Sequence, residues 1–176
     1  MVTGYDHLFF LAGVIFFLYR LRDVGIYVTL FAVGHGLTLI VGVWFDIPAN
    51  AYLIDAIIGF SVVYKAFENL GGFQRLGFNP NTRLAVLIFG LFHGFGLATK
   101  LQEISLSQEG LLANLIAFNV GVEIGQLLAL LAIIALMSAW RRQSSFSRQA
   151  IIANTALMFA GYLLVGYQLS GFFLTR

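Results

Sequence analysis

The chain has 176 residues, of which 60% are hydrophobic and only 10% are charged. A soluble domain carries about 25% charged residues, so this composition excludes an ordinary soluble protein. The formal net charge of +2 is too small to indicate nucleic-acid binding. Because the chain contains no cysteine, a disulfide framework, a thiolate metal site and a cysteine nucleophile are also excluded.

Apolar segments recur along the chain and predict six helices within one transmembrane domain that spans residues 1–176. The helices are expected at residues 5–19, 24–44, 52–68, 84–99, 111–140 and 149–174. Most of them are near or above the roughly 18–20 residues that cross a bilayer. The first is shorter, so we expect it to be tilted or to have its outer end shielded by protein. The predicted fold class is all-α, a polytopic transmembrane bundle.

The basic residues predict the orientation of this bundle. They collect in the connections after the first, third and fifth helices: Arg20, Arg22, Arg75, Arg83, Arg141, Arg142 and Arg148. The other two connections hold only Lys100, beside Asp46, Glu103 and Glu109. Because basic loops remain in the cytoplasm, we expect both termini to lie outside.

Polar side chains interrupt the apolar segments at comparable depths. At about 1.5 Å of rise per residue, His35, His93 and Glu123 are expected near the middle of the membrane. Asp6, His7 and Asp55 begin their helices and are expected near the outer surface. Lys65 and Glu68, spaced i, i+3, are interpreted as an interfacial ion pair or as a lysine that snorkels to the interface.

The fifth predicted helix carries Asn119, Glu123 and Gln126 at i, i+4 and i+7, which places them on one face. On a neighbouring face, Gly121 and Gly125 form a small-xxx-small pair that would let another helix approach. Gly34, Gly36 and Gly94 flank the central histidines. They either allow close packing or permit local unwinding that frees carbonyl oxygens as ligands.

A short internal repeat relates the two helices that carry the central histidines. Phe31, His35, Gly36 and Leu39 match Phe89, His93, Gly94 and Leu97 in spacing. The deduced topology runs both helices in the same direction. Helices one and two, and helices three and four, are therefore hypothesised to be parallel repeats around a midplane site.

A single buried histidine is more often a structural residue than a ligand. Three histidines together with three acids at similar depths favour a functional site instead, because ionisable groups inside membranes are usually functional. Neutral imidazole and carboxylate without thiolate suit Ni²⁺ or Co²⁺, and also Zn²⁺, Cu²⁺ or Fe²⁺. The candidate metal ligands are Asp6, His7, His35, Asp55, His93 and Glu123, with Thr38, Asn119 and Gln126 orienting them.

Four blocks of the sequence resemble the HupE/UreJ family. They are residues 4–11 (GYDHLFFL), 34–39 (GHGLTL), 89–98 (FGLFHGFGLA) and 118–126 (FNVGVEIGQ). The resemblance implies a small polytopic protein linked to nickel or cobalt uptake. It also implies that Asp6, His7, His35, His93 and Glu123 occupy the family's characteristic polar positions. Asp55 stands where many relatives have glutamate, which keeps the charge but shortens the reach.

The leading hypothesis is a divalent metal permease in a bacterial plasma membrane, with the lipid bilayer and the metal ion as its partners. Two alternatives remain open. One is an intramembrane metalloenzyme that activates water or oxygen. The other is an accessory subunit of a larger membrane complex, and a homo-oligomer is a further option. No nucleic-acid partner is expected.

Overall fold

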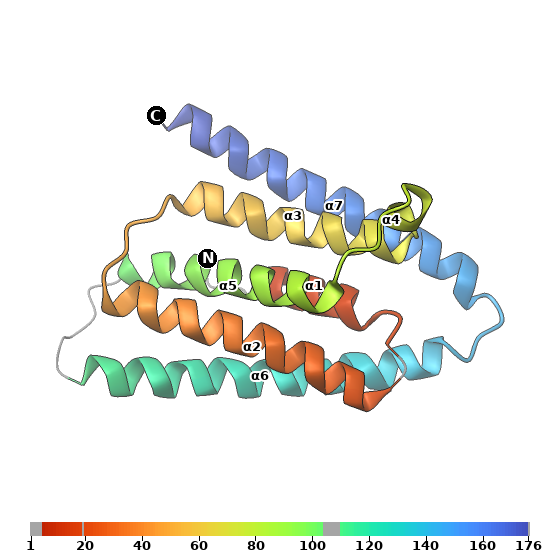
Figure 1. Ribbon diagram of the computed structural model, residues 1–176, viewed down its shortest axis with the longest axis horizontal. Coiled ribbons are helices and arrows are strands. Elements are labelled where there is room, and N and C mark those ends of the chain that lie inside the picture. The colour runs from red at the N-terminus through yellow and green to blue at the C-terminus, as the bar shows by residue number, and fades with distance from the viewer. Residues whose placement is uncertain (1–4, 19, 104–109, 176) are drawn as a thin grey trace.

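The computed structural model describes residues 5–18, 20–103 and 110–175, with the backbone alone described for residues 5–7. Within these residues all regular structure is helical, which confirms the predicted all-α class. The helices are α1 (Tyr5–Ile15), α2 (Leu21–Trp44), α3 (Ala51–Asn69), α4 (Gly72–Arg75), α5 (Thr82–Gln102), α6 (Leu111–Trp140) and α7 (Phe146–Leu174). Figure 1 shows the long helices lying side by side, with α7 at one edge of the bundle and α6 at the other.

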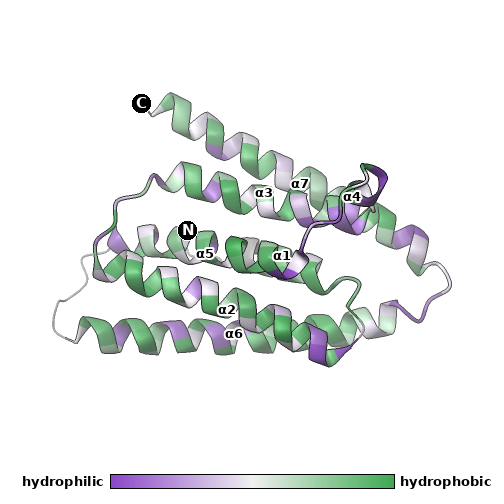
Figure 2. Ribbon diagram, in the orientation of Figure 1, coloured by the Kyte–Doolittle hydropathy of each residue, from purple (hydrophilic) through white to green (hydrophobic). Residues whose placement is uncertain are grey.

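Four helices are long and apolar enough to cross a membrane, namely α2, α5, α6 and α7. Helices α3 and α1 do not meet this criterion, for separate reasons. Helix α3 has 19 residues but carries the charged residues Asp55, Lys65 and Glu68, and α1 has only 11 residues. In Figure 2 the long helices are mainly hydrophobic with scattered hydrophilic positions, and hydrophilic residues also gather in the connections. The chain is an integral membrane protein.

Local sequence signals set most helix ends. Asn50 caps α3 by accepting a hydrogen bond from the Leu53 N–H, and Asn81 caps α5 by accepting from the N–H groups of Arg83 and Leu84. At the end of α2, Asp46 adopts a left-handed conformation with φ of 47°. The Ile47 N–H then bonds the Gly42 carbonyl at 3.0 Å, which completes a Schellman-type stop.

Helix α1 ends at Ile15, four residues before its predicted end. The Arg141 guanidinium, just beyond α6, donates hydrogen bonds to the carbonyls of Ile15, Phe16 and Leu18 at 2.6–2.9 Å. These carbonyls therefore find their donors in a tertiary contact rather than in a further turn of helix.

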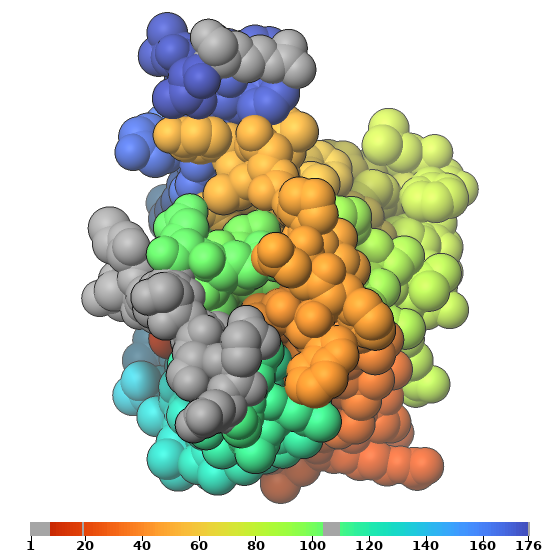
Figure 3. Space-filling model, turned by 90° about the vertical axis from the view of Figure 1, so that its left-hand side faces the viewer, coloured from red at the N-terminus to blue at the C-terminus, as the bar shows by residue number. Residues whose placement is uncertain are grey.

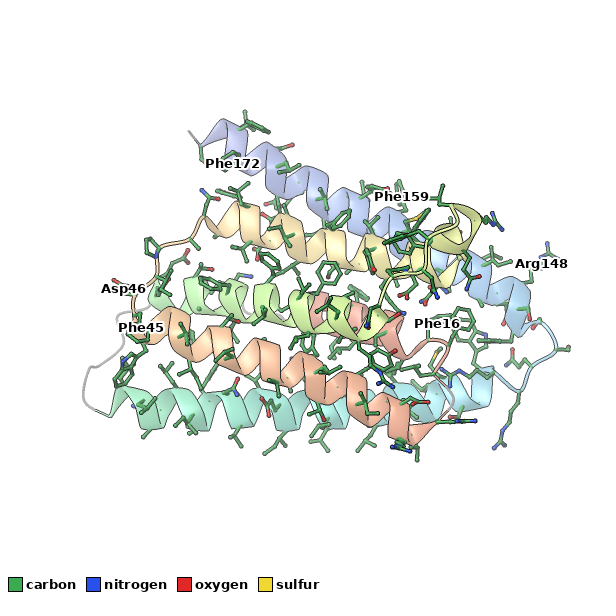
Figure 4. All side chains as sticks on the ribbon, in the orientation of Figure 1. Phe16, Phe45, Asp46, Arg148, Phe159 and Phe172 are labelled. Atoms are coloured by element: carbon green, nitrogen blue, oxygen red, sulfur yellow. The ribbon has the colours of Figure 1, made fainter. Side chains whose placement is uncertain are left out.

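The bundle has two chemically different ends. The basic end contains the connections that follow α1, α3 and α6, and the acidic end contains the connection from α2 to α3 together with the start of α6 and the end of α7. Figure 4 shows Arg148 at the basic end and Asp46 at the acidic end. Figure 3 views the acidic end, where α2, α3, α5, α6 and α7 all terminate.

The helices pack most extensively in the pairs α2–α5 and α3–α7, and α3–α5 contacts join the two pairs. A buried apolar cluster fills the space between α1, α2, α3 and α5. Its members are Phe10, Leu11, Val14, Ile15, Val24, Phe31, Val62, Val86, Phe89 and, from α6, Leu130. This core lies on the basic-end side of the two central histidines.

Candidate functional site

His35 of α2 and His93 of α5 are both fully buried, with 0% exposure. The Phe31 ring contacts both of them. It stacks on His35 with ring centroids 6.0 Å apart and meets His93 edge-on at 5.1 Å. The structure therefore brings the two central histidines to one place in the core.

Glycines bring the helices of these histidines into close contact. A Cβ on Gly94 would lie 2.1 Å from the His35 carbonyl oxygen, and one on Gly34 would lie 2.7 Å from the Leu87 carbonyl oxygen. Both distances are far shorter than any real Cβ contact. Gly34 and Gly94 thus act as packing residues, and α2 and α5 remain helical through them.

The contacts along this interface run in parallel order. Gly34 meets the backbone at Leu87–Leu91, and the Gly42 position meets Ala98. Between them, the Thr38 hydroxyl donates a hydrogen bond to the Leu91 carbonyl at 2.6 Å. The predicted parallel course of the two repeat helices is confirmed. Thr38 joins the helices, so it fixes their relative shift.

The His93 ring has a defined orientation. Its Nδ1 lies 2.7 Å from the Phe89 carbonyl oxygen. Because a carbonyl can only accept, Nδ1 carries the proton, and in the neutral ring the Nε2 lone pair is the one directed away from this contact. Histidines that bind metals commonly have one ring nitrogen fixed in this way.

Three phenylalanine rings close the basic-end side of the histidines. The Phe10 ring lies 5.6 Å from the rings of both Phe31 and Phe89 and 5.3 Å from His93. All three phenylalanines are at most 8% exposed. The three contacting rings form an apolar layer between the histidines and the basic end.

Helix α6 brings its polar face to α2. The Asn119 amide donates to the Glu123 carboxylate at 3.0 Å, and Asn119, Glu123 and Gln126 are all half-buried. A Cβ on Gly36 would lie 2.7 Å from Asn119 Nδ2, so the glycine after His35 makes room for this side chain. Gly34 and Gly36 therefore serve different neighbours, α5 and α6.

The two glycines of α6 do not make the helix contact that their spacing suggests. Within the described chain, no heavy atom lies within 4 Å of a Cβ placed on Gly121 or Gly125. Both residues are exposed. The expected close approach of another helix at this face is therefore absent from the described residues, because α6 is turned with Asn119 and Glu123, not its glycines, toward α2.

Asp55 lies near the acidic end of α3, as expected from its position in the sequence. Its carboxylate receives the Lys100 ammonium at 3.3 Å on one oxygen and the Gln168 amide at 3.3 Å on the other. Sequence reasoning missed both partners. The available signals were that Lys100 is the single base in the outer connections and that Gln168 is a polar residue in an apolar helix.

Asp6 and His7 lie outside the residues whose side chains the structure describes, but their backbone belongs to the first turn of α1. That helix is anchored at the basic end, where the Asn69 amide donates to the Gly13 carbonyl at 2.9 Å. Ten residues back from Ile15, the first turn is about 15 Å away. Since α2 is about 36 Å long, α1 begins near mid-bundle. This backbone therefore starts farther from the acidic end than the sequence led us to expect.

The predicted ion pair between Lys65 and Glu68 is confirmed. Lys65 Nζ lies 2.7 Å from a Glu68 oxygen, and the Thr82 hydroxyl donates to the other Glu68 oxygen. Nearby, the Asn69 amide donates to the buried Asn154 at 2.9 Å. These contacts tie α3 to α5 and α7 at the basic end, on the far side of the aromatic layer from the histidines.

Among the residues with described side chains, no three of His, Asp and Glu are grouped as a metal site. The structure assembles part of the predicted set instead. It brings His35 and His93 together and leaves Asp55 at the acidic end with Lys100. Asn119, which bonds Glu123, lies beside Gly36.

These features define an all-helical integral membrane protein with a buried pair of histidines at the contact of two parallel helices. No match was found among curated proteins or among solved structures. The chain belongs to the HupE/UreJ protein family, whose model matches residues 1–176. Membership associates the chain, in general terms, with the transport of metal ions across membranes.

Proposed function

We propose that the protein is a permease for a divalent transition-metal ion, most favourably Ni²⁺ or Co²⁺. The observation that supports this best is the buried pair of His35 and His93. Ionisable groups inside membranes are usually functional, and the contact of His93 Nδ1 with the Phe89 carbonyl fixes one ring nitrogen as is common in metal-binding histidines. Membership of the HupE/UreJ family independently supports a role in metal transport.

In this proposal six helices form the membrane domain, with α1 and α3 shielded by the longer spans. The basic end faces the cytoplasm and the acidic end faces outside, so both termini lie outside. The separation of charges in the fold supports this orientation, since basic residues lie in or beside the connections at one end: Arg75, Arg83, Arg141, Arg142 and Arg148.

The ion would enter from the acidic end and meet Asp55. It would then reach the midplane ligands, which we assign to His35, His93 and Glu123 together with Asp6 and His7 of the first turn of α1. Asn119 supports Glu123 through its amide, Gln126 lies one turn further along the same face, and Thr38 holds the α2–α5 register. The mid-bundle start of α1 supports a place for its first turn near the histidines.

Release to the cytoplasm would require the Phe10, Phe31 and Phe89 rings to move apart. The described structure therefore corresponds to a state closed toward the basic end. Such a barrier is expected in a permease, because a path open at both ends would let protons and other ions leak.

The test is uptake of Ni²⁺ and Co²⁺ by cells and by proteoliposomes that contain the protein. His93→Ala should reduce uptake at least tenfold, because half of the buried imidazole pair is lost. Leu37→Ala is a matched control, since Leu37 lies on α2 close to His35 in sequence but is 57% exposed. Wild-type uptake by His93→Ala would contradict the proposal, as would chelator-resistant, stoichiometric metal in the purified protein, which indicates an enzyme.

A further inference from the structure

The Asp55 carboxylate is already occupied by a cation that belongs to the protein. Lys100 Nζ lies 3.3 Å from Asp55 Oδ1, and the Gln168 amide donates to Oδ2. Lys100 comes from α5, seven residues beyond His93, which corresponds to about 10 Å along the helix. A Cβ on Gly96 would lie 3.5 Å from Asp55 Oδ1. The pair therefore stands between the acidic end and the buried histidines.

A second ion pair on the same helix shows how firmly such a contact can be made. Lys65 and Glu68 are 2.7 Å apart, with side-chain exposures of 10% and 19%, and Thr82 adds a hydrogen bond to Glu68. In the Asp55 pair the distance is longer, and the Lys100 side chain is 30% exposed. Ion pairs that water reaches contribute little to stability, so the Lys100 ammonium is readily displaced.

The surroundings give this lysine a distinct electrostatic role. At the acidic end, Lys100 is the one basic side chain among the described residues, which also include Asp46, Glu103 and Asp55 there. Its positive charge lowers the attraction of this end for every cation. A divalent ion interacts with a carboxylate about twice as strongly as an ammonium at equal distance, whereas Na⁺ or K⁺ has no such advantage.

We propose that Lys100 is a built-in competitor for Asp55, which a divalent cation displaces and a monovalent cation does not. Lys100 is then a selectivity-determining residue of the entry path. It raises the concentration of metal needed for uptake and protects Asp55 from the far more abundant monovalent ions. This inference rests on the proposed function, because it assumes that the metal ion passes Asp55.

The experiment compares wild type with Lys100→Met and Lys100→Arg in proteoliposomes. The readouts are the KM and the maximal rate of Ni²⁺ uptake. A third readout is the inhibition of uptake by Na⁺ or K⁺ at about 100 mM, compared with choline at the same concentration. Lys100→Met should lower the KM about two- to fivefold, the size expected for a partly exposed ion pair. It should also make uptake sensitive to Na⁺ or K⁺, and Lys100→Arg should behave as wild type.

Two further variants separate competition from structure. Gln168→Met removes an uncharged partner of the same carboxylate and should leave the KM within about twofold of wild type. In Asp55→Asn, the further change Lys100→Met should no longer lower the KM, because the shared carboxylate is gone. Thermal unfolding in detergent identifies any variant that is simply misfolded. If Lys100→Met is misfolded, the KM of Lys100→Arg is compared with that of wild type instead.

An unchanged KM in Lys100→Met, or an equal fall in KM in Gln168→Met, would overturn the competitor role. Wild-type protein that neither binds nor transports Ni²⁺ or Co²⁺ is a different result and contradicts the proposed function itself. Retained wild-type transport with an unchanged KM in Lys100→Met overturns only the present inference.

Discussion

Two helices of this bundle carry a pair of glycines four residues apart, α5 (Gly90 and Gly94) and α6 (Gly121 and Gly125), but only α5 uses its pair for contact within the described chain. At the α2–α5 interface, Gly34 and Gly94 remove side chains where the backbones meet. On α6, Gly121 and Gly125 face open space within the described chain. The spacing alone is therefore not enough, because a helix contact also needs a partner on the same side.

The difference also separates the two kinds of candidate ligand. Both histidines lie in the tightly packed region, where their positions are fixed by backbone contact. Glu123 lies on α6, of which only Leu115, Leu130 and Met137 are fully buried. Its link to the histidine region is the Asn119 side chain in the space beside Gly36. We infer that the histidines form the rigid part of the site and that α6 is the part free to adjust.

The largest expected effect comes from filling the tight region. Gly94→Ala places a methyl group 2.1 Å from the His35 carbonyl oxygen and 2.3 Å from Thr38 Oγ1, so the two helices must separate. We expect a loss of about 3 kcal/mol or more in the free energy of unfolding, measured in mixed detergent micelles. Wild-type stability in this variant would show that α2 and α5 are further apart than described.

A smaller effect is expected where α6 meets α2. Gly36→Ala places its methyl group 2.7 Å from Asn119 Nδ2, which is the movable end of a side chain. The loss of stability should be about 1–2 kcal/mol, because the side chain can turn away. Ni²⁺ uptake should also fall, and the fall should persist at temperatures where the variant is fully folded, since Asn119 then leaves Glu123. Unchanged uptake would argue against a role for this contact in transport.

Thr38→Val tests the hydrogen bond that fixes the helix register. The side chain keeps its shape but loses the bond to the Leu91 carbonyl. We expect a loss of about 0.5–1 kcal/mol in the free energy of unfolding, as for other hydrogen bonds between membrane helices. Thr38→Ser, which keeps the hydroxyl, is the control and should lie closer to wild type.

An effect of similar size but opposite sign is expected on α6. Gly121→Ala adds a methyl group in open space and should change stability by about 0.5–1 kcal/mol, on the stabilising side, because alanine favours helix. The same measurement as for Gly94→Ala gives a direct contrast between the two regions. Strong destabilisation, or a change of oligomeric state in native mass spectrometry, would show that another molecule covers this face.

Features set by neighbours along the chain could be predicted from the sequence. The predicted helix at residues 111–140 coincides with α6, and Asn81 caps α5 inside the predicted cap at residues 79–82. The Lys65–Glu68 pair follows from i, i+3 spacing on one helix. Hydropathy, capping and helical spacing act over a few residues, so a single sequence is enough to reveal them.

Features set by contacts between helices were decided only by the tertiary structure. Arg141 bonds the Ile15 carbonyl at the end of α1 from 126 residues away. Lys100 reaches Asp55 across 45 residues, and Asn119 finds its place beside Gly36. These contacts depend on the rotation and relative shift of whole helices. Such movements are governed by the packing of many side chains, so no local pattern in the sequence specifies them.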